Sequence, residues 1–179
     1  MTSSLLRRVH ERLAESGIAH ALIGAAALAI HGISRSTFDQ DLLVIDRRAL
    51  EPSIWVGIAD GADVDIRRGD DNDPLAGVVR LVSPGERDVD VVVGRHEWQR
   101  GILDEAIVCD TPGGAIPVAA PAGLVLLKLY AGAPQDLWDI EQLRTAVGGP
   151  ALDAAVNSQV HSLPLRAREA WARLISTTS

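Results

Sequence analysis

The chain contains few lysine, cysteine or aromatic residues. Lys128 is the only lysine among its 17 basic residues, and all the others are arginine. One cysteine, Cys109, excludes an internal disulfide and argues against a cysteine-rich zinc site. With an aromatic fraction of 3%, the core must be built from Ala, Val, Leu and Ile. The sequence has no apolar stretch long enough for a signal peptide or a membrane span, which predicts a cytoplasmic protein with no membrane partner.

The length and net charge of the chain indicate how many domains it has and which partners it can bind. The 179 residues are 47% hydrophobic and 23% charged, which fits one soluble domain over residues 1–179. A net charge of −7 weighs against broad, nonspecific binding to nucleic acid, since such binding needs many basic contacts to phosphate. A small local basic patch, or a basic partner protein, remains compatible with this balance.

Strand patterns dominate the first part of the chain and helix patterns the rest. We expect a catalytic core with a β-sheet over residues 1–120 and C-terminal helices over 121–179, packed on the sheet as an α+β fold. The expected helices cover residues 4–16, 25–30, 121–131, 134–147 and 151–175, the last interrupted at Pro164. The expected strands cover residues 18–23, 38–45, 64–67, 78–82, 89–93, 107–109 and 116–118, the last four as two hairpins, whereas the acidic segment 58–74 otherwise reads as irregular.

Asp39 and Asp41 form the first candidate site. They lie two residues apart in an apolar strand pattern, so their side chains should point to the same face. Two carboxylates this close repel each other unless a cation lies between them, and hard oxygen ligands favour Mg²⁺ or Mn²⁺. The alternative is an exposed strand end at which Asp39 forms a salt bridge with Arg35.

A third carboxylate follows in the β-branched run Val89-Asp90-Val91-Val92-Val93, where an unpaired aspartate would be costly. Asp90 is therefore a candidate to complete the pair. Asp88, which should face the same side as Asp90, competes for this role, as does the pair Asp63 and Asp65. The sequence does not choose among them.

Two further features favour an anionic substrate. Gly24 lies where a strand turns into a helix, and the first amides of such a helix can bind phosphate, although a glycine is also used for the turn alone. Lys128 lies in the apolar helical run 121–130, where its ammonium needs an anion such as a triphosphate oxygen or a carboxylate. The alternative for Lys128 is a long side chain reaching solvent from the edge of a packed helix.

Together these motifs resemble a known superfamily. Ile23-Gly24-Ala25, then Asp39-x-Asp41, then a later strand aspartate, is similar to the nucleotidyltransferases of the polymerase beta fold. The segment from Leu22 to Leu43, with Leu126-Leu-Lys-Leu-Tyr-Ala131 and Asp136-Leu-Trp-Asp139, resembles the AbiEii/AbiGii-type toxin nucleotidyltransferases. The resemblance spans roughly residues 22–143.

The resemblance implies a role for each motif residue. Asp39, Asp41 and Asp90 would bind Mg²⁺ or Mn²⁺, and an NTP would be the substrate. Phosphate contacts would come from Gly24, Ala25, Arg35 and Lys128, with Asp136 orienting Lys128 or the substrate. Three positions depart from the family pattern: Ala25 lacks a hydroxyl, Gln40 is polar where an apolar residue is usual, and Gln135 replaces a basic residue.

The leading hypothesis is thus a magnesium-dependent enzyme that transfers a nucleoside monophosphate to an acceptor and releases pyrophosphate. By resemblance the acceptor would be an RNA end, such as that of a tRNA, in a toxin-antitoxin pair with an antitoxin protein as partner. A small hydroxylated acceptor, as in the aminoglycoside nucleotidyltransferases, is the enzyme alternative. A non-catalytic nucleotide-binding protein with a decayed site is the third hypothesis, since Ala25 and Gln135 could weaken phosphate binding.

Overall fold

The computed structural model describes residues 4–34, 39–59 and 61–177, and the chain divides into two compact units. The first unit comprises Met1–Ala27 and Arg35–Ala119 and contains the sheet. The second comprises Leu28–Ser34 and Ala120–Ser179 and is helical. No helix in the described ranges is both long and apolar enough to cross a membrane.

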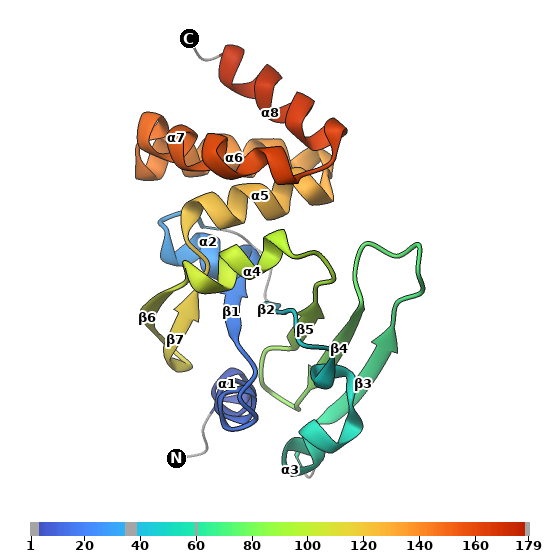
Figure 1. Ribbon diagram of the computed structural model, residues 1–179. Coiled ribbons are helices and arrows are strands. Elements are labelled where there is room, and N and C mark those ends of the chain that lie inside the picture. The colour runs from blue at the N-terminus through green and yellow to red at the C-terminus, as the bar shows by residue number, and fades with distance from the viewer. Residues whose placement is uncertain (1–3, 35–38, 60, 178–179) are drawn as a thin grey trace. The chain divides into compact units, whose positions relative to one another are not determined.

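The first unit is built on a mixed sheet of seven strands in the order β3-β4-β5-β2-β1-β7-β6 (Figure 1). Parallel pairs join β2 to β5 and β1 to β7, and the other neighbours are antiparallel. This confirms the α+β class. The strands are β1 (His20–Ile23), β2 (Gln40–Val44), β3 (Asp63–Arg68), β4 (Gly77–Val82), β5 (Val89–Val93), β6 (Ile107–Thr111) and β7 (Gly114–Val118).

Helix α1 (Leu5–Glu15) shows why the sequence pattern works at the N-terminal end. The side chain of Ser4 caps it by accepting a hydrogen bond from the Arg7 amide, and its leucines and Val9 are buried at helical spacing. Gly17, with φ of 67°, lets the chain turn toward β1 directly after the helix.

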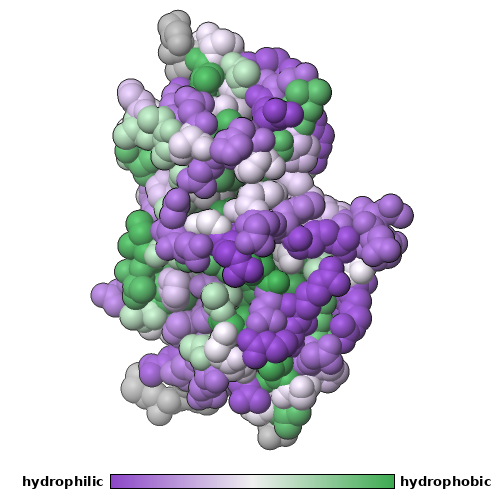
Figure 2. All heavy atoms as spheres, in the orientation of Figure 1, coloured by the Kyte–Doolittle hydropathy of each residue, from purple (hydrophilic) through white to green (hydrophobic). Residues whose placement is uncertain are grey.

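The sheet has one packed face and one open face at its β3-β4-β5 side. Along β4 and β5 buried and half-exposed residues alternate, because successive side chains point to opposite faces. Val79, Leu81 and Val91 are fully buried on the packed face. Figure 2 shows hydrophilic side chains gathered over the β3-β4 hairpin on the face turned to the viewer.

The second unit contains four consecutive helices, α5 (Pro121–Ala131), α6 (Pro134–Val147), α7 (Gly149–Gln159) and α8 (Leu165–Ser176), with the short 3-10 turn η3 (Val160–Ser162) before α8. Pro121 and Pro134 begin α5 and α6 at a position where the missing amide costs nothing. Helix α5 is the most apolar of the four and contacts the other three. Buried Trp171 of α8 donates its indole N–H to Asn157 of α7.

The strands and the four C-terminal helices agree with the sequence prediction to within a few residues. Sequence reasoning missed α3 (Val56–Ala59), whose end runs into the acidic segment 58–74, but the strand expected at 64–67 in that segment is confirmed as β3. Sequence reasoning also missed α4 (Trp98–Asp104) and the 3-10 turns η1 (Arg47–Leu50) and η2 (Pro52–Trp55). Such short elements have too few turns to show a clear period. Helix α2 (Gly24–Ile30) begins one residue before its predicted start.

Candidate functional site

Asp41 and Asp90 lie side by side on parallel strands. β2 and β5 pair in a register that places Asp41 directly opposite Asp90, so both side chains point to the same face. Asp39 precedes β2 by one residue, and its side chain is 53% exposed. The register thus places Asp41 and Asp90 on one face, whereas the shared face of Asp39 and Asp41 stays a prediction.

Gly24 follows β1 and begins α2, and the structure adds a second reason for glycine there. Its φ is +63°, a conformation that other residues rarely adopt. A Cβ atom at this position would clash with Oδ2 of Asp41, because the two atoms would lie far closer than non-bonded atoms can approach. The glycine therefore leaves the room that the Asp41 carboxylate occupies, in addition to permitting the turn.

Asp90 is more buried than Asp39, Asp65 and Asp88. Its side chain is 16% exposed, and its Oδ1 atom is buried with no hydrogen-bond partner. Burial raises the pKa of the Asp90 carboxyl, Arg80 opposes that rise, and the negative charges of Asp39 and Asp88 add to it. A buried carboxylate oxygen without a partner is the kind of group that a cation or a donor from a ligand satisfies.

Arg80 of β4 is the functional candidate that sequence reasoning missed. Its guanidinium lies 2.6 Å from Oδ2 of Asp88, 3.1 Å from Oδ2 of Asp90 and 3.8 Å from Oδ2 of Asp39. The hydrogen bond to Asp88 is the largest cause of the raised pKa of Arg80. The available signal was a single charged residue in the apolar run 78–82, at the half-exposed phase of the alternation.

The sheet register explains this meeting. Arg80 is directly opposite Asp90 on β5 and Asp65 on β3, so a single row of charged residues crosses the sheet from Asp65 through Arg80 and Asp90 to Asp41. Asp88, which competes with Asp90 for the role of third carboxylate, belongs to the same group through Arg80. Asp65, a second competitor for that role, pairs with exposed Arg67 at 2.8 Å.

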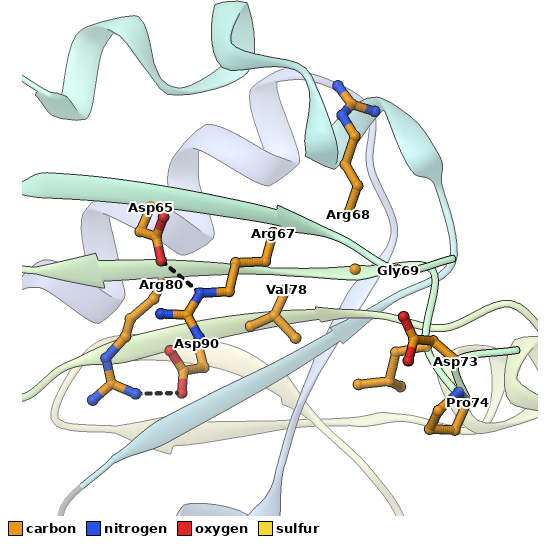
Figure 3. A pocket seen from close by; sticks show the side chains of 11 residues that line it. Asp65, Arg67, Arg68, Gly69, Asp73, Pro74, Val78, Arg80 and Asp90 are labelled. Carbon is orange, nitrogen blue, oxygen red and sulfur yellow. Dashed lines mark hydrogen bonds and ion pairs between the residues drawn. The ribbon is translucent and has the colours of Figure 1, made fainter. Parts of the chain in front are cut away.

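A pocket of about 780 Å³ opens on this face between the β3-β4 hairpin and the loop that joins them. Figure 3 shows Asp65, Arg67, Arg80 and Asp90 on one side of it, and Gly69, Asp73 and Pro74 from the loop on the other. Arg95 holds the loop by donating to the carbonyl oxygens of residues 70, 71 and 75. The full lining comprises Asp65, Arg67, Arg68, Gly69, Asp73, Pro74, Leu75, Gly77, Val78, Arg80 and Asp90.

The donor set suits a hard divalent cation, but the carboxylates are not drawn together around a common point. Within residues 4–34, 39–59 and 61–177, no group of three or more His, Cys, Asp or Glu side chains is placed to hold a metal ion. The partnerless Oδ1 of Asp90 and the placement of Asp41 opposite Asp90 fit a metal among these aspartates. The guanidinium of Arg80 is the cation that Asp39, Asp88 and Asp90 meet instead.

The structure says little about two of the predicted phosphate contacts, Ala25 and Arg35. Ala25 lies in the first turn of α2 and is half-buried. Arg35 lies outside the described residues, as does the salt bridge between Arg35 and Asp39. Their roles therefore stay predictions.

Lys128 belongs to the second unit, where two aspartates of α6 hold its ammonium. Its Nζ donates to Oδ1 of Asp136 at 3.0 Å and to Oδ2 of Asp139 at 2.5 Å. Asp136 also accepts a hydrogen bond from the Ala133 amide at the start of α6, where the helix dipole favours a negative charge. Lys128 is 15% exposed, so it is not a side chain reaching out to solvent.

Asp139 was missed as a partner of Lys128. Only 2% of its side-chain area is exposed, so it is almost completely buried. Its spacing of three residues from Asp136 places both on one side of α6, and that spacing was the available signal. An ammonium has three donors, so one remains after the two aspartates are satisfied.

No protein-family model and no curated protein sequence matches the chain. Among solved structures, the antibiotic-resistance factor ANT(2'')-Ia is 12% identical, with 98% of this chain and 96% of that chain covered and a TM-score of 0.55. A candidate nucleotidyltransferase from Thermotoga maritima is 16% identical, with coverage of 79% and 89% and a TM-score of 0.52. One from H. pylori is 16% identical, with coverage of 96% and 94% and a TM-score of 0.53. The chain therefore has the fold of nucleotidyltransferases.

Proposed function

We propose that this protein is a nucleotidyltransferase that transfers a nucleoside monophosphate from an NTP to a hydroxyl acceptor. The observation that carries the proposal is the placement of Asp41 and Asp90 opposite each other on β2 and β5, with Gly24 leaving room at Asp41. The fold shared with ANT(2'')-Ia and the two candidate nucleotidyltransferases supports it.

Asp39, Asp41 and Asp90 are the proposed ligands of Mg²⁺ or Mn²⁺. The ions would neutralise triphosphate charge and align the groups for in-line displacement. The acceptor oxygen forms a bond to the α-phosphorus as the bond to pyrophosphate breaks, and the hydroxyl proton must leave. Asp90 is suited to take that proton, because its carboxylate lines the pocket in which the acceptor would bind.

Two further phosphate contacts are proposed, and fewer observations support them. The backbone amides after Gly24 would bind phosphate through the main chain, since Ala25 offers no hydroxyl. Lys128, which donates to Asp136 and Asp139 within the second unit, stays a predicted triphosphate contact on the resemblance alone. Both contacts depend on an NTP as substrate.

For the acceptor we propose a small hydroxylated molecule. The pocket beside Asp90 has a volume of about 780 Å³, which is in the range of sites for a single small ligand. The net charge of −7 also disfavours a long phosphate backbone as acceptor. The antibiotic-resistance factor ANT(2'')-Ia shares the fold over 96% of its own length. The proposal of a small acceptor is consistent with this similarity.

The RNA end, the tRNA acceptor and the antitoxin partner expected from the AbiEii resemblance form the competing hypothesis. They require a basic surface, and the pairs Arg7-Arg8, Arg47-Arg48 and Arg67-Arg68 are the available candidates. In the structure Arg48 pairs with Asp46 at 2.6 Å and Arg67 with Asp65 at 2.8 Å, which weakens both as phosphate contacts.

The test is a transfer assay with each α-labelled NTP, Mg²⁺ or Mn²⁺, and either total RNA or a panel of aminoglycosides as acceptor. We expect transfer to a small acceptor by the wild type and a loss of at least about 100-fold in Asp41→Asn, because a ligand charge is removed at the reacting phosphate. Asp110→Asn is the matched control, since Asp110 is an exposed aspartate of the edge strand β6 in the same unit.

Equal transfer by the wild type and Asp41→Asn would contradict the proposed site. Label entering RNA alone would replace the small acceptor by the toxin-like function. NTP binding without transfer to any acceptor would leave the decayed, non-catalytic binding protein.

A further inference from the structure

Arg80 occupies the position of a counter-cation within the proposed metal site. Its two terminal nitrogens meet carboxylate oxygens that come from two separate segments, Asp39 before β2 and Asp88 and Asp90 at β5. Two of the three proposed metal ligands, Asp39 and Asp90, are thus already paired with a cation of the chain itself. Figure 3 shows the ion pair between Arg80 and Asp90 at the wall of the pocket.

A guanidinium and a divalent ion cannot use the same oxygen fully at the same time. Oδ2 of Asp90 is bound by Arg80, whereas Oδ1 of the same carboxyl is buried without a partner. One carboxylate therefore has one oxygen engaged and one available for a cation. In the described ranges no three-carboxylate cluster is placed to hold a metal, and Asp39 and Asp90 contact Arg80.

Release of Arg80 is physically accessible. Its side chain is 41% exposed and lines the pocket, so on leaving the aspartates the guanidinium would enter solvent-filled space rather than a packed core. In the pocket its planar set of donors could then meet oxygen atoms of a bound substrate. Asp88, held at 2.6 Å, can keep one end of the guanidinium nearby.

We propose that Arg80 is a resident counter-cation that divalent metal must displace from Asp39 and Asp90 before the site becomes active. Arg80 thereby holds the carboxylates together in the metal-free protein and lowers their affinity for metal. It is a positioning residue, and this inference rests on the metal site of the proposed function. It assigns to this chain a regulatory contact that the three-aspartate motif does not contain.

The test is Mn²⁺ binding without nucleotide, measured by titration calorimetry and by the loss of the free Mn²⁺ signal in electron paramagnetic resonance. We expect Arg80→Gln to bind Mn²⁺ about tenfold more tightly than the wild type, comparable in size to changes in the surroundings of other metal ligands. The control is Arg67→Gln, which removes the same charge from the same face; Arg67 pairs with Asp65 and acts on Asp90 through its charge alone. Its affinity should stay within about twofold of the wild type, because solvent and salt screen its charge.

A second variant covers the case in which Arg80→Gln does not fold. Arg80→Lys keeps the charge but loses the two-pronged geometry, so its Mn²⁺ affinity should lie between those of the wild type and Arg80→Gln. Mn²⁺ should also raise the melting temperature of Arg80→Gln more than that of the wild type.

Affinity unchanged or weakened in Arg80→Gln, or tightened equally in Arg67→Gln, would overturn the proposal, as would the absence of Mn²⁺ binding in all the proteins. The outcome is separable from that of the transfer assay. Transfer by a wild type whose Mn²⁺ affinity does not depend on Arg80 would reject displacement alone, and tighter Mn²⁺ binding without transfer would reject the enzymatic function alone.

Discussion

Each unit of this protein contains a basic side chain that contacts two or more aspartates, Arg80 in the first unit and Lys128 in the second. The two clusters differ in their burial. In the first unit Arg80 is 41% exposed and the partner carboxylates range from 16% to 53%. In the second unit Lys128 is 15% exposed and Asp139 2%. Water and salt screen the first cluster, whereas the second is nearly closed to them. The comparison indicates that the exposed Arg80 cluster can exchange its ion-pair partners. The buried Lys128 cluster instead fixes the packing of α5 with α6.

Burial also sets the energetic roles. Exposed ion pairs contribute little to the free energy of folding, because their charges are well solvated when apart. Breaking a buried pair by removing one partner is costly, because it leaves a charge in a poorly solvated place. The Lys128 cluster should therefore matter for stability and the Arg80 cluster mainly for the occupancy of the site.

The largest expected effect is at Lys128. Lys128→Met leaves Asp136 and Asp139 without their shared cation, and Asp139 has almost no access to water. We expect the free energy of unfolding in urea to fall by about 3–5 kcal/mol. Arg80→Gln should lower it much less. Similar losses of unfolding free energy in Lys128→Met and Arg80→Gln would show that the two clusters do not differ in their contribution to stability.

The next effect concerns the room beside Asp41. Gly24→Ala should lower the free energy of unfolding by about 1–3 kcal/mol for the unfavourable φ, and more for the contact with the Asp41 carboxylate. Gly85→Ala is the matched variant, since Gly85 has φ of 76° and no atom within 4 Å of the added Cβ. A loss in Gly24→Ala no greater than in Gly85→Ala would show that Asp41 does not need this space.

The smallest effect tests burial at a pair of histidines in the first unit. Nδ1 of His20 lies 2.8 Å from the Ile18 carbonyl oxygen, and Nε2 lies 2.7 Å from Nδ1 of His10. If Nδ1 of His20 carries the proton, its Nε2 accepts from His10. Burial is the main cause that lowers the pKa of His20 from its ordinary value of 6.5, and the charge of His10 lowers it further.

The folded pKa of His20 thus lies below the unfolded one, so the unfolded chain binds more protons below about pH 6.5. The stabilisation is complete above that pH and is lost as the pH falls through the folded pKa. For one proton the slope cannot exceed about 1.4 kcal/mol per pH unit. Urea unfolding between pH 7.5 and 5 should show this slope in the wild type and in His161→Gln, an exposed histidine variant, but not in His20→Gln.

Much of the fold could be predicted because its patterns are local. The alternation along β4 and β5 and the helical spacing in α1 depend only on the geometry of a strand and a helix. The prolines that begin α5 and α6 marked helix starts equally well. Helix α4 and the 3-10 turns were missed because they are short, whereas β3 was predicted to within one residue at each end.

The candidate site was predictable only in part. The carboxylates of residues 39, 41 and 90 could be proposed from their strand patterns, and Asp136 from its place after the lysine helix. Arg80 and Asp139 could not be assigned partners, because an arginine in one strand gives no indication of which strand lies beside it. Their contacts depend on sheet order and on helix packing, which are long-range properties.

The sequence by itself determined most of the elements, the candidate carboxylates and the isolation of a single lysine in an apolar helix, since these follow from residue type and spacing. The tertiary structure alone decided which charges meet. The register of β2, β4 and β5 brings Arg80 to Asp90 and Asp90 to Asp41, and the packing of α5 with α6 brings Lys128 to Asp139. Electrostatic interactions depend on distance and on burial, and neither is defined until the chain has folded.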